Sequence, residues 1–294
     1  MAADKAPGLC MALNKACIGK QYPPVKTAVT LEAIQQYARA YNDNNPRFLD
    51  HKAPGGIVAP PMFGVTVTWL SLIGAMADPE VRADLLRLLH SAQEMEFVRP
   101  IRPGDVISST AKVISIESAP NGETMAVELD ATSDNNEPVG KTVFTVFIRG
   151  RRDSGRNADP RAAAAPDRGP ALVTVAQTID KDQTFRYAEA SGDLNPIHID
   201  ENVAKMAGLP GVIVHGLCTM AFTSKVMIDH LCDGDPTRLK RLAVRFSRPV
   251  FPGDTITTRV WSDGERGARR IYAYETLNPD GLAVIRHGLA EVAS

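Results

Sequence analysis

The sequence is poor in features that would place the protein on a membrane, on nucleic acid or around a metal. Its four cysteines, Cys10, Cys17, Cys218 and Cys232, form no CxxC pair and show no metal-type spacing to histidine. The 33 basic residues nearly balance 34 acidic ones, so no charge excess attracts a nucleic acid or an anionic membrane surface. No apolar run reaches the ~18 residues that a transmembrane helix needs. We therefore expect no nucleic acid, membrane or metal partner.

Targeting signals are also scarce. The N-terminal region carries Asp4 and Lys5 before a short apolar stretch that Pro7 and Gly8 interrupt, so it lacks a signal-peptide core. Residues 291–294 do not match the Ser-Lys-Leu peroxisomal signal. Free thiols fit a reducing compartment. Together with the absence of a nucleotide motif, these observations predict a cytoplasmic protein that needs no cofactor.

The sequence does contain an internal repeat at an offset of about 150 residues, which indicates a duplicated unit. Three blocks recur in the same order: residues 40–46 as 190–196, residues 55–58 as 211–214, and residues 97–105 as 246–254. Residues 149–170, rich in Arg, Gly, Ala and Pro, are typical of a solvated linker, with a phosphate-binding patch as the alternative. The chain is thus predicted to hold two domains, residues 1–148 and 171–294.

Both halves have the same predicted layout, which is an α+β design. Each begins with a short helix and continues with a long one that is apolar all round and is therefore expected to be buried. Antiparallel strands follow, with Pro-Gly-Asp turns between them. The expected helices are 31–41, 62–77, 182–190 and 217–231, and the expected strands are 106–116, 124–133, 141–148, 242–248, 255–261, 271–278 and 282–292. Asp180 is expected to cap the third helix and Asp200 a helix that begins at Glu201.

The second half carries a turn that can perform acid–base chemistry. Asp193, Asn195 and His198 lie within six residues, punctuated by Gly and Pro, and Gly216 follows at the mouth of the long apolar helix. An Asp and a His can move protons to and from one water, and an N–H at a helix N-terminus can bind an oxyanion. The same composition is also common in plain turns, where Asp and Asn bond their own backbone. The combination with His198 and Gly216 favours the catalytic interpretation.

Three segments of this half resemble the signature of the MaoC-like family, in particular its R-specific (type 2) enoyl-CoA hydratases. They are residues 191–200 (SGDLNPIHID), 214–218 (VHGLC) and 244–253 (VRFSRPVFPG). The resemblance implies a hotdog fold, in which an antiparallel sheet wraps a long helix, here in a tandem, double-hotdog form. It also implies a lyase of fatty acid metabolism that adds water to a trans-2-enoyl-CoA and gives a (3R)-3-hydroxyacyl-CoA.

The resemblance assigns roles to residues of the second half. Asp193 and His198 are expected to be the catalytic acid and base, Asn195 to orient the water or brace the turn, and Gly216 to bind the thioester oxygen. Residues expected to contact the acyl-CoA substrate are Pro196, His215, Arg245 and Arg248. For His215, capping or packing is favoured over catalysis. The two arginines fit either CoA phosphates or plain surface charges.

Three other functions stay open at this level. The reverse reaction, dehydration of a 3-hydroxyacyl thioester in a synthetic pathway, uses the same residues. An acyl-CoA thioesterase is a different enzyme class that hotdog folds also support. A non-enzymatic acyl-thioester-binding module is the third alternative, and an intact Asp193–His198 pair argues against it.

The first half resembles a degenerate hotdog of the same family. It keeps Asp43, Asn45 and Pro46, but Phe48 stands where the motif needs His, and Ala59-Pro60 is aligned with His215-Gly216. One active site per chain is therefore expected. We expect the halves to share one sheet about a pseudo-two-fold axis, with the acyl pocket between them. Phe48 and Trp69 are expected on the far wall of this pocket. A homodimer is also expected.

Overall fold

The computed structural model describes residues 12–84, 87–150 and 168–294, and within them one antiparallel sheet runs through both halves. Its ten strands stand in the order β1-β3-β4-β5-β2-β7-β10-β9-β8-β6. The strands of the N-terminal half are β1 (Val25–Ala28), β2 (Leu88–Phe97), β3 (Val106–Ala119), β4 (Gly122–Ser133) and β5 (Pro138–Arg149). Those of the C-terminal half are β6 (Val173–Thr178), β7 (Leu239–Phe246), β8 (Thr255–Arg266), β9 (Arg269–Leu277) and β10 (Ala283–Ala293).

The strand order is symmetric about the pairing of β2 with β7. Reading outward from this pair gives β2-β5-β4-β3-β1 on one side and β7-β10-β9-β8-β6 on the other. The predicted continuous sheet with pseudo-two-fold symmetry is therefore confirmed. The seven expected strands are present, but β1, β2 and β6 were not predicted. Most of the expected linker, residues 151–167, lies outside the described residues, and Arg149 belongs to β5. The boundaries at 148 and 171 stay predictions.

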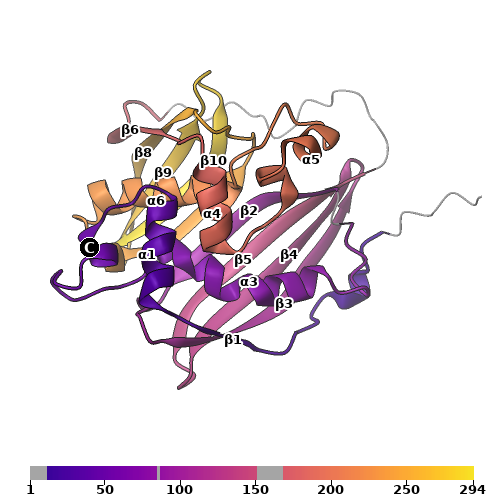
Figure 1. The fold of residues 1–294 in the computed structure, drawn as a ribbon, viewed down its shortest axis with the longest axis horizontal. Coiled ribbons are helices and arrows are strands. Elements are labelled where there is room, and N and C mark those ends of the chain that lie inside the picture. The colour runs from indigo at the N-terminus through magenta and orange to yellow at the C-terminus, as the bar shows by residue number, and fades with distance from the viewer. Residues whose placement is uncertain (1–11, 85–86, 151–167) are drawn as a thin grey trace, which may run out of the picture.

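The helices lie against the sheet as the sequence predicts. α3 (Gly64–Met76) crosses β3 and β4, on the face that also carries the short helices α1 (Leu31–Ala40), α4 (Gln183–Ser191) and α5 (Glu201–Met206) (Figure 1). The long helix of the second half, α6 (Gly216–Leu231), contacts β7 and β6, and 12 of its 16 residues are buried. Among the described residues, no helix is long and apolar enough to cross a membrane.

The expectation that both long helices are buried all round is wrong for α3. Leu70 and Ile73, on its outer face, are 62% and 42% exposed. A uniformly apolar sequence therefore does not mean uniform burial here, because no element of the described chain covers this side of α3.

Two capping predictions have different outcomes. The Asp200 carboxylate accepts hydrogen bonds from Asn202 N–H (2.8 Å) and Val203 N–H (3.2 Å), so it caps α5 as expected. The Asp180 carboxylate does not cap α4. It pairs instead with the Arg186 guanidinium at 2.6 Å. Asp182 occupies the N-cap position, but its carboxylate also pairs with Arg186, at 3.1 Å, and makes no capping bond. The ion pair with Arg186 takes the Asp180 carboxylate away from the backbone N–H groups that it was expected to cap.

Two fully buried tyrosines mark the pseudo-two-fold axis. Tyr37 of α1 and Tyr187 of α4 are 150 positions apart, which is the repeat offset, and their hydroxyl oxygens are 2.9 Å apart. Tyr37 Oη donates to the Met62 carbonyl at 3.0 Å, so the Tyr187 hydroxyl is the donor within the pair. Burial raises the pKa of both phenols, which stay neutral and hydrogen-bonded. The pair joins α1 to α4 at the centre of the molecule.

Candidate active site

The turn that carries Asp193 is shaped by the end of α4. Gly192 ends the helix with a φ of +79°, a left-handed conformation that glycine adopts at no steric cost. Asp193 Oδ1 then accepts from Asn195 N–H at 3.2 Å, and Asn195 Oδ1 accepts from Ile197 N–H at 3.4 Å. The second bond caps η4 (Pro196–His198), a short 3₁₀ helix. Local sequence thus turns the chain so that His198 follows Asp193 after one tight bend.

Asp193 and His198 are brought together in a poorly solvated place. His198 is 8% exposed, and its Nδ1 lies 2.8 Å from the Ile213 carbonyl. A carbonyl can only accept, so Nδ1 carries the proton and Nε2 is left with a free lone pair. Burial lowers the pKa of His198 below 6.5 and raises the pKa of Asp193 above 3.8. Both shifts favour a neutral imidazole beside a carboxyl group that holds its proton more tightly.

His215 lies against this pair. Its ring stacks on the His198 ring with centroids 3.8 Å apart and planes 27° apart, and its Nε2 is 3.0 Å from the Asp193 carbonyl oxygen. The side chain is 1% exposed, so its contacts are with protein groups rather than with an open pocket. It also forms no side-chain cap on α6.

The same three residues offer potential metal-ligand atoms within 4.8 Å of one another. One nitrogen of each imidazole is bonded to a backbone carbonyl, His198 Nδ1 to Ile213 and His215 Nε2 to Asp193. This leaves His198 Nε2 and His215 Nδ1 as the nitrogens with a free lone pair. We call Asp193, His198 and His215 the acid–base cluster.

The N-terminus of α6 supplies the third element of the site. Gly216 is the first residue of this helix, so its N–H has no partner within the helix. No acceptor among the described residues binds it either. A Cβ on Gly216 would lie 3.2 Å from the Phe246 ring, so the glycine keeps the backbone accessible below that ring. A free N–H at the positive end of a 16-residue helix is suited to a developing negative charge.

The other residues predicted to bind substrate are exposed in the structure. Pro196 is exposed and begins η4. Arg248 is exposed, and its guanidinium donates to the Ala283 carbonyl at 3.1 Å. Arg245 is exposed near the end of β7. Both arginines are thus free to meet an anion, and neither the phosphate role nor the surface role is favoured by these contacts.

Comparison with known proteins identifies the family of the chain. Residues 162–280 match the MaoC like domain, and residues 16–145 match the FAS1-like dehydratase domain region. An enoyl-CoA hydratase, ChsH3, of Mycobacterium tuberculosis is 30% identical over 256 residues, which is 85% of this chain and 89% of that protein. The chain belongs to the MaoC-like dehydratase family. It is an enzyme of the hydro-lyase type.

Alignments with a further relative and with two solved structures cover nearly the whole of this chain. A probable enoyl-CoA hydratase 2 of Dictyostelium discoideum is 29% identical over 94% of this chain and 95% of that protein. A solved MaoC-like dehydratase superposes with a TM-score of 0.80 at 24% identity, over 95% of this chain and 99% of the other. A Mycobacterium tuberculosis structure described as a double hotdog superposes with a TM-score of 0.63, over 94% of this chain and 96% of the other, at 13% identity. The predicted tandem hotdog fold is confirmed.

The structure corrects the alignment of the two MaoC-like halves by one residue. Ala59 N–H donates to the Ile101 carbonyl at 2.8 Å, and Val214 N–H donates to the Val250 carbonyl at 2.8 Å. These bonds are equivalent under the pseudo-symmetry, so Ala59 matches Val214 rather than His215. The sequence could not show this because the loops before α3 and α6 differ in composition.

Pro60 and Pro61 therefore stand where the second half has His215 and Gly216. Proline has no N–H, so the first half has no donor at the oxyanion position, while a proline at the first turn still allows a helix to begin. Phe48 replaces the imidazole and is fully buried. The loss of both groups supports the prediction of one active site per chain.

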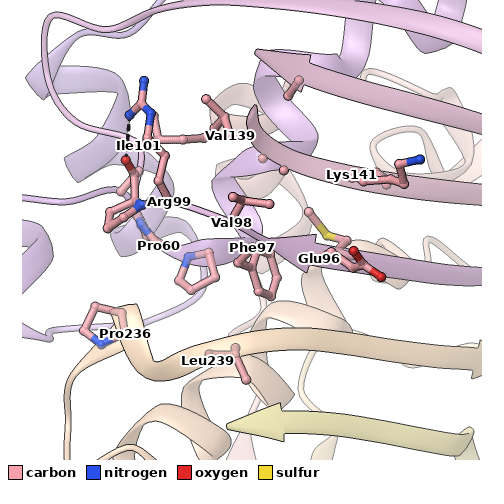
Figure 2. Close-up of a pocket in the computed structure, with 18 of the residues that line it drawn as sticks. Pro60, Glu96, Phe97, Val98, Arg99, Ile101, Val139, Lys141, Pro236 and Leu239 are labelled. Carbon is pink, nitrogen blue, oxygen red and sulfur yellow. Dashed lines mark hydrogen bonds between the residues drawn. The ribbon is translucent and has the colours of Figure 1, made fainter. Parts of the chain in front are cut away.

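Figure 2 shows a cavity of about 50 Å³ at this counterpart position in the degenerate half. Its lining residues come from both halves and include Pro60, Phe97, Arg99, Pro236 and Leu239. Neither Asp193 nor His198 lines it, so it differs from the acyl pocket predicted beside those residues.

The retained motif residues of the degenerate half hold the two halves together. Asp43 is 2% exposed, and Lys225 Nζ of α6 lies 3.5 Å from its Oδ1. Asn45 Nδ2 donates to the Gly234 carbonyl at 2.8 Å. The first half has therefore kept its Asp and Asn, but both face the C-terminal half as structural contacts.

An Asp43→Asn variant is expected to keep kcat within about threefold, because no acid–base group is lost. Its melting temperature is expected to fall by no more than about 3 °C, or to rise. Burial raises the pKa of Asp43 despite Lys225, so the site prefers a neutral side chain, and Asn keeps the acceptor for Asn45 N–H at 3.0 Å. Steady-state kinetics measures kcat, and circular dichroism measures the melting temperature. Loss of turnover in a folded variant would show that the first half takes part in catalysis.

Two residues near the site were given no role from the sequence. The Phe246 ring covers Gly216, and His90 of β2 lies 4.7 Å from it, centroid to centroid. His90 thus brings the N-terminal half into contact with the ring that covers Gly216, and burial lowers the pKa of His90 to about 3. Nothing in the local sequence of β2 indicates this, since the contact depends on the pairing of β2 with β7.

Proposed function

We propose that the protein is an R-specific 2-enoyl-CoA hydratase, which adds water to a trans-2-enoyl-CoA and gives a (3R)-3-hydroxyacyl-CoA. The observation that carries the proposal is the free Nε2 lone pair of His198 next to the partly buried carboxyl group of Asp193. Relatives of the same family, named as enoyl-CoA hydratases, support the same reaction.

We propose the following proton steps for this pair. A water held between Asp193 and His198 gives one proton to His198 Nε2 as its oxygen bonds to C3 of the enoyl group. The protonated Asp193 carboxyl gives its proton to C2, on the same face. The pair then holds an imidazolium and a carboxylate, and transfer of one proton from His198 to Asp193 restores the starting state. Such acid–base assistance contributes ~10²–10⁴-fold in rate.

Charge develops on the thioester oxygen as water adds, and the Gly216 N–H is the group we propose to stabilise it. The helix dipole of α6 and the unpaired N–H act in the same direction. A donor of this kind contributes on the order of 10²–10³ in rate. Asn195 braces the turn by capping η4, which keeps Asp193 and His198 at their separation.

The substrate is proposed to enter along the C-terminal half. Arg245 and Arg248 are exposed and would meet the CoA phosphates. The acyl chain would run between the halves beside Trp69, whose Cδ1 lies 3.6 Å from an ideal Cβ on Gly192. Phe48 does not share this role, because it is fully buried in the first half and exposes no surface to a pocket.

Assembly and location are proposals of the same kind. A homodimer is consistent with the two free edges of the sheet, β1 and β6, since strand edges can associate. A cytoplasmic location is supported by the free cysteines Cys17, Cys218 and Cys232.

Incubation with crotonyl-CoA and with a bulky enoyl-CoA tests the proposed reaction. Loss of enoyl absorbance and formation of the 3R product are expected, before and after treatment with EDTA, because the mechanism uses only side chains and backbone. A thiol reagent in a parallel sample detects hydrolysis. An S product, or release of free CoA in place of hydration, would contradict the proposal and favour a thioesterase in the second case.

A further inference from the structure

His215 makes one contact that packing alone does not explain. Its Nε2 donates to the Asp193 carbonyl oxygen at 3.0 Å, across 22 residues of sequence. The neutral ring then has an unprotonated Nδ1, which is buried and has no partner among the described residues. Burial lowers the pKa of His215 to about 3, so Nε2 keeps the single proton over the working pH range. The donor role of Nε2 is therefore fixed.

The turn that receives this bond has few other anchors. Asp193 follows the left-handed Gly192, and Leu194 after it is 63% exposed. The remaining bonds of Asp193 are local: its N–H donates to Ser191 Oγ at 3.2 Å, and its carboxylate accepts from Asn195 N–H at 3.2 Å. The bond from His215 is thus the link between this turn and the residue that precedes α6.

His215 is held firmly enough to act as such a link. Its ring lies between the His198 ring, 3.8 Å away, and the Tyr187 ring, 5.1 Å away, centroid to centroid. Tyr187 is itself fixed by its bond to Tyr37 on the pseudo-two-fold axis. A rigid central element therefore supports the imidazole that holds Asp193.

We propose that His215 is a positioning residue for the hydration reaction, which holds Asp193 within reach of the water through its Nε2–H. The inference rests on the proposed function, since the effect on rate is an effect on Asp193. His215 contacts no substrate in this role.

The test compares His215→Phe, which keeps a ring between its neighbours but loses the donor, with His215→Gln, whose amide restores one. The Phe variant is expected to lose about tenfold or more in kcat, because misplacing a catalytic group by about 1 Å can cost ~10²-fold. KM is expected to change little, and Gln to recover most of kcat. In an Asp193→Asn background the Phe substitution is expected to have no further effect.

A second measurement is independent of activity. Hydrogen exchange of the Asn195 amide, which bonds to Asp193, is expected to accelerate in the Phe variant and not in the Gln variant. Wild-type kcat in the Phe variant, or equal impairment of Phe and Gln variants with unchanged melting temperatures, would overturn the positioning role. If exchange changes as expected while the wild-type protein hydrates no enoyl-CoA, the proposed function fails and takes the positioning role in hydration with it, while the bond that anchors the Asp193 turn is still shown.

Discussion

Asp193→Asn and His198→Ala variants are each expected to lower kcat by ~10²–10⁴-fold with little change in fold. Asn is isosteric with Asp but cannot supply a proton to C2, and Ala removes the Nε2 lone pair that takes the proton of water. The measurement is kcat for hydration of crotonyl-CoA, with circular dichroism as the control. Activity within tenfold of wild type in either variant would place the acid or base elsewhere.

The pH profile of the same variants gives a sharper check. The base must be neutral, and burial lowers the pKa of His198 below 6.5, so the wild-type rate is expected to persist below pH 6.5. It should fall only as the pH drops through that lowered pKa. The proposed acid, Asp193, must keep its proton, and burial raises its pKa above 3.8. The wild-type rate is therefore expected to fall again as the pH rises through that raised pKa. The residual activity of the Asp193→Asn variant is expected to lack this alkaline limb, and an unchanged alkaline limb in the variant would assign it to another group.

A Gly216→Pro variant is expected to lower kcat by on the order of 10²–10³-fold, because proline removes the proposed N–H donor and nothing else that the reaction uses. The fold provides its own precedent, since Pro61 begins the short 3₁₀ helix Pro61–Phe63 that leads directly into α3 in the first half. The residue before each position is extended as a proline requires, with φ −51° and ψ 141° at Pro60 and φ −55° and ψ 135° at His215. Steady-state kinetics on a folded variant measures the effect.

Gly216→Ala is the matched control for this substitution. Alanine keeps the N–H and adds a methyl group that meets the Phe246 ring at 3.2 Å, a contact that a small ring movement relieves. The Ala variant is therefore expected to lose much less activity than the Pro variant. Equal losses would show that crowding at Phe246, and not the donor, explains the effect of proline.

The sequence indicates the turn of the candidate site because its signals are local. Asp193, Asn195 and His198 lie in one bend, and Asn195 bonds with its neighbours there. The tautomer of His198 and the anchor of Asp193 depend on Ile213 and His215, which lie farther along the chain. The repeat offset also predicts the continuous sheet. What the sequence does not show depends on contacts between distant segments. β2 was missed because polar residues interrupt its apolar pattern, and one of them, Glu94, finds its partner in the other half, Arg241 at 2.7 Å.

Three other differences have the same origin. Pro60 and Pro61 align with His215 and Gly216 only once the backbone bonds of both loops are known. The exposure of Leu70 follows from what lies above α3 in space, and no periodicity in the helix itself could reveal it. His215 was assigned to substrate binding by its place in the motif, but its role in the cluster depends on where its two nitrogens point.

The tyrosine pair on the pseudo-two-fold axis shows what one chain can do that two identical chains cannot. In an exact two-fold dimer the two hydroxyls would be copies of one residue, and the direction of the proton between them would be random. Here the Met62 carbonyl accepts from Tyr37, so the direction of the two hydrogen bonds is fixed. Tyr187 of the catalytic half donates to Tyr37 of the degenerate half, which donates to Met62. Fusing the two copies has turned a symmetric contact into a polar one, with a permanent direction at the centre of the enzyme.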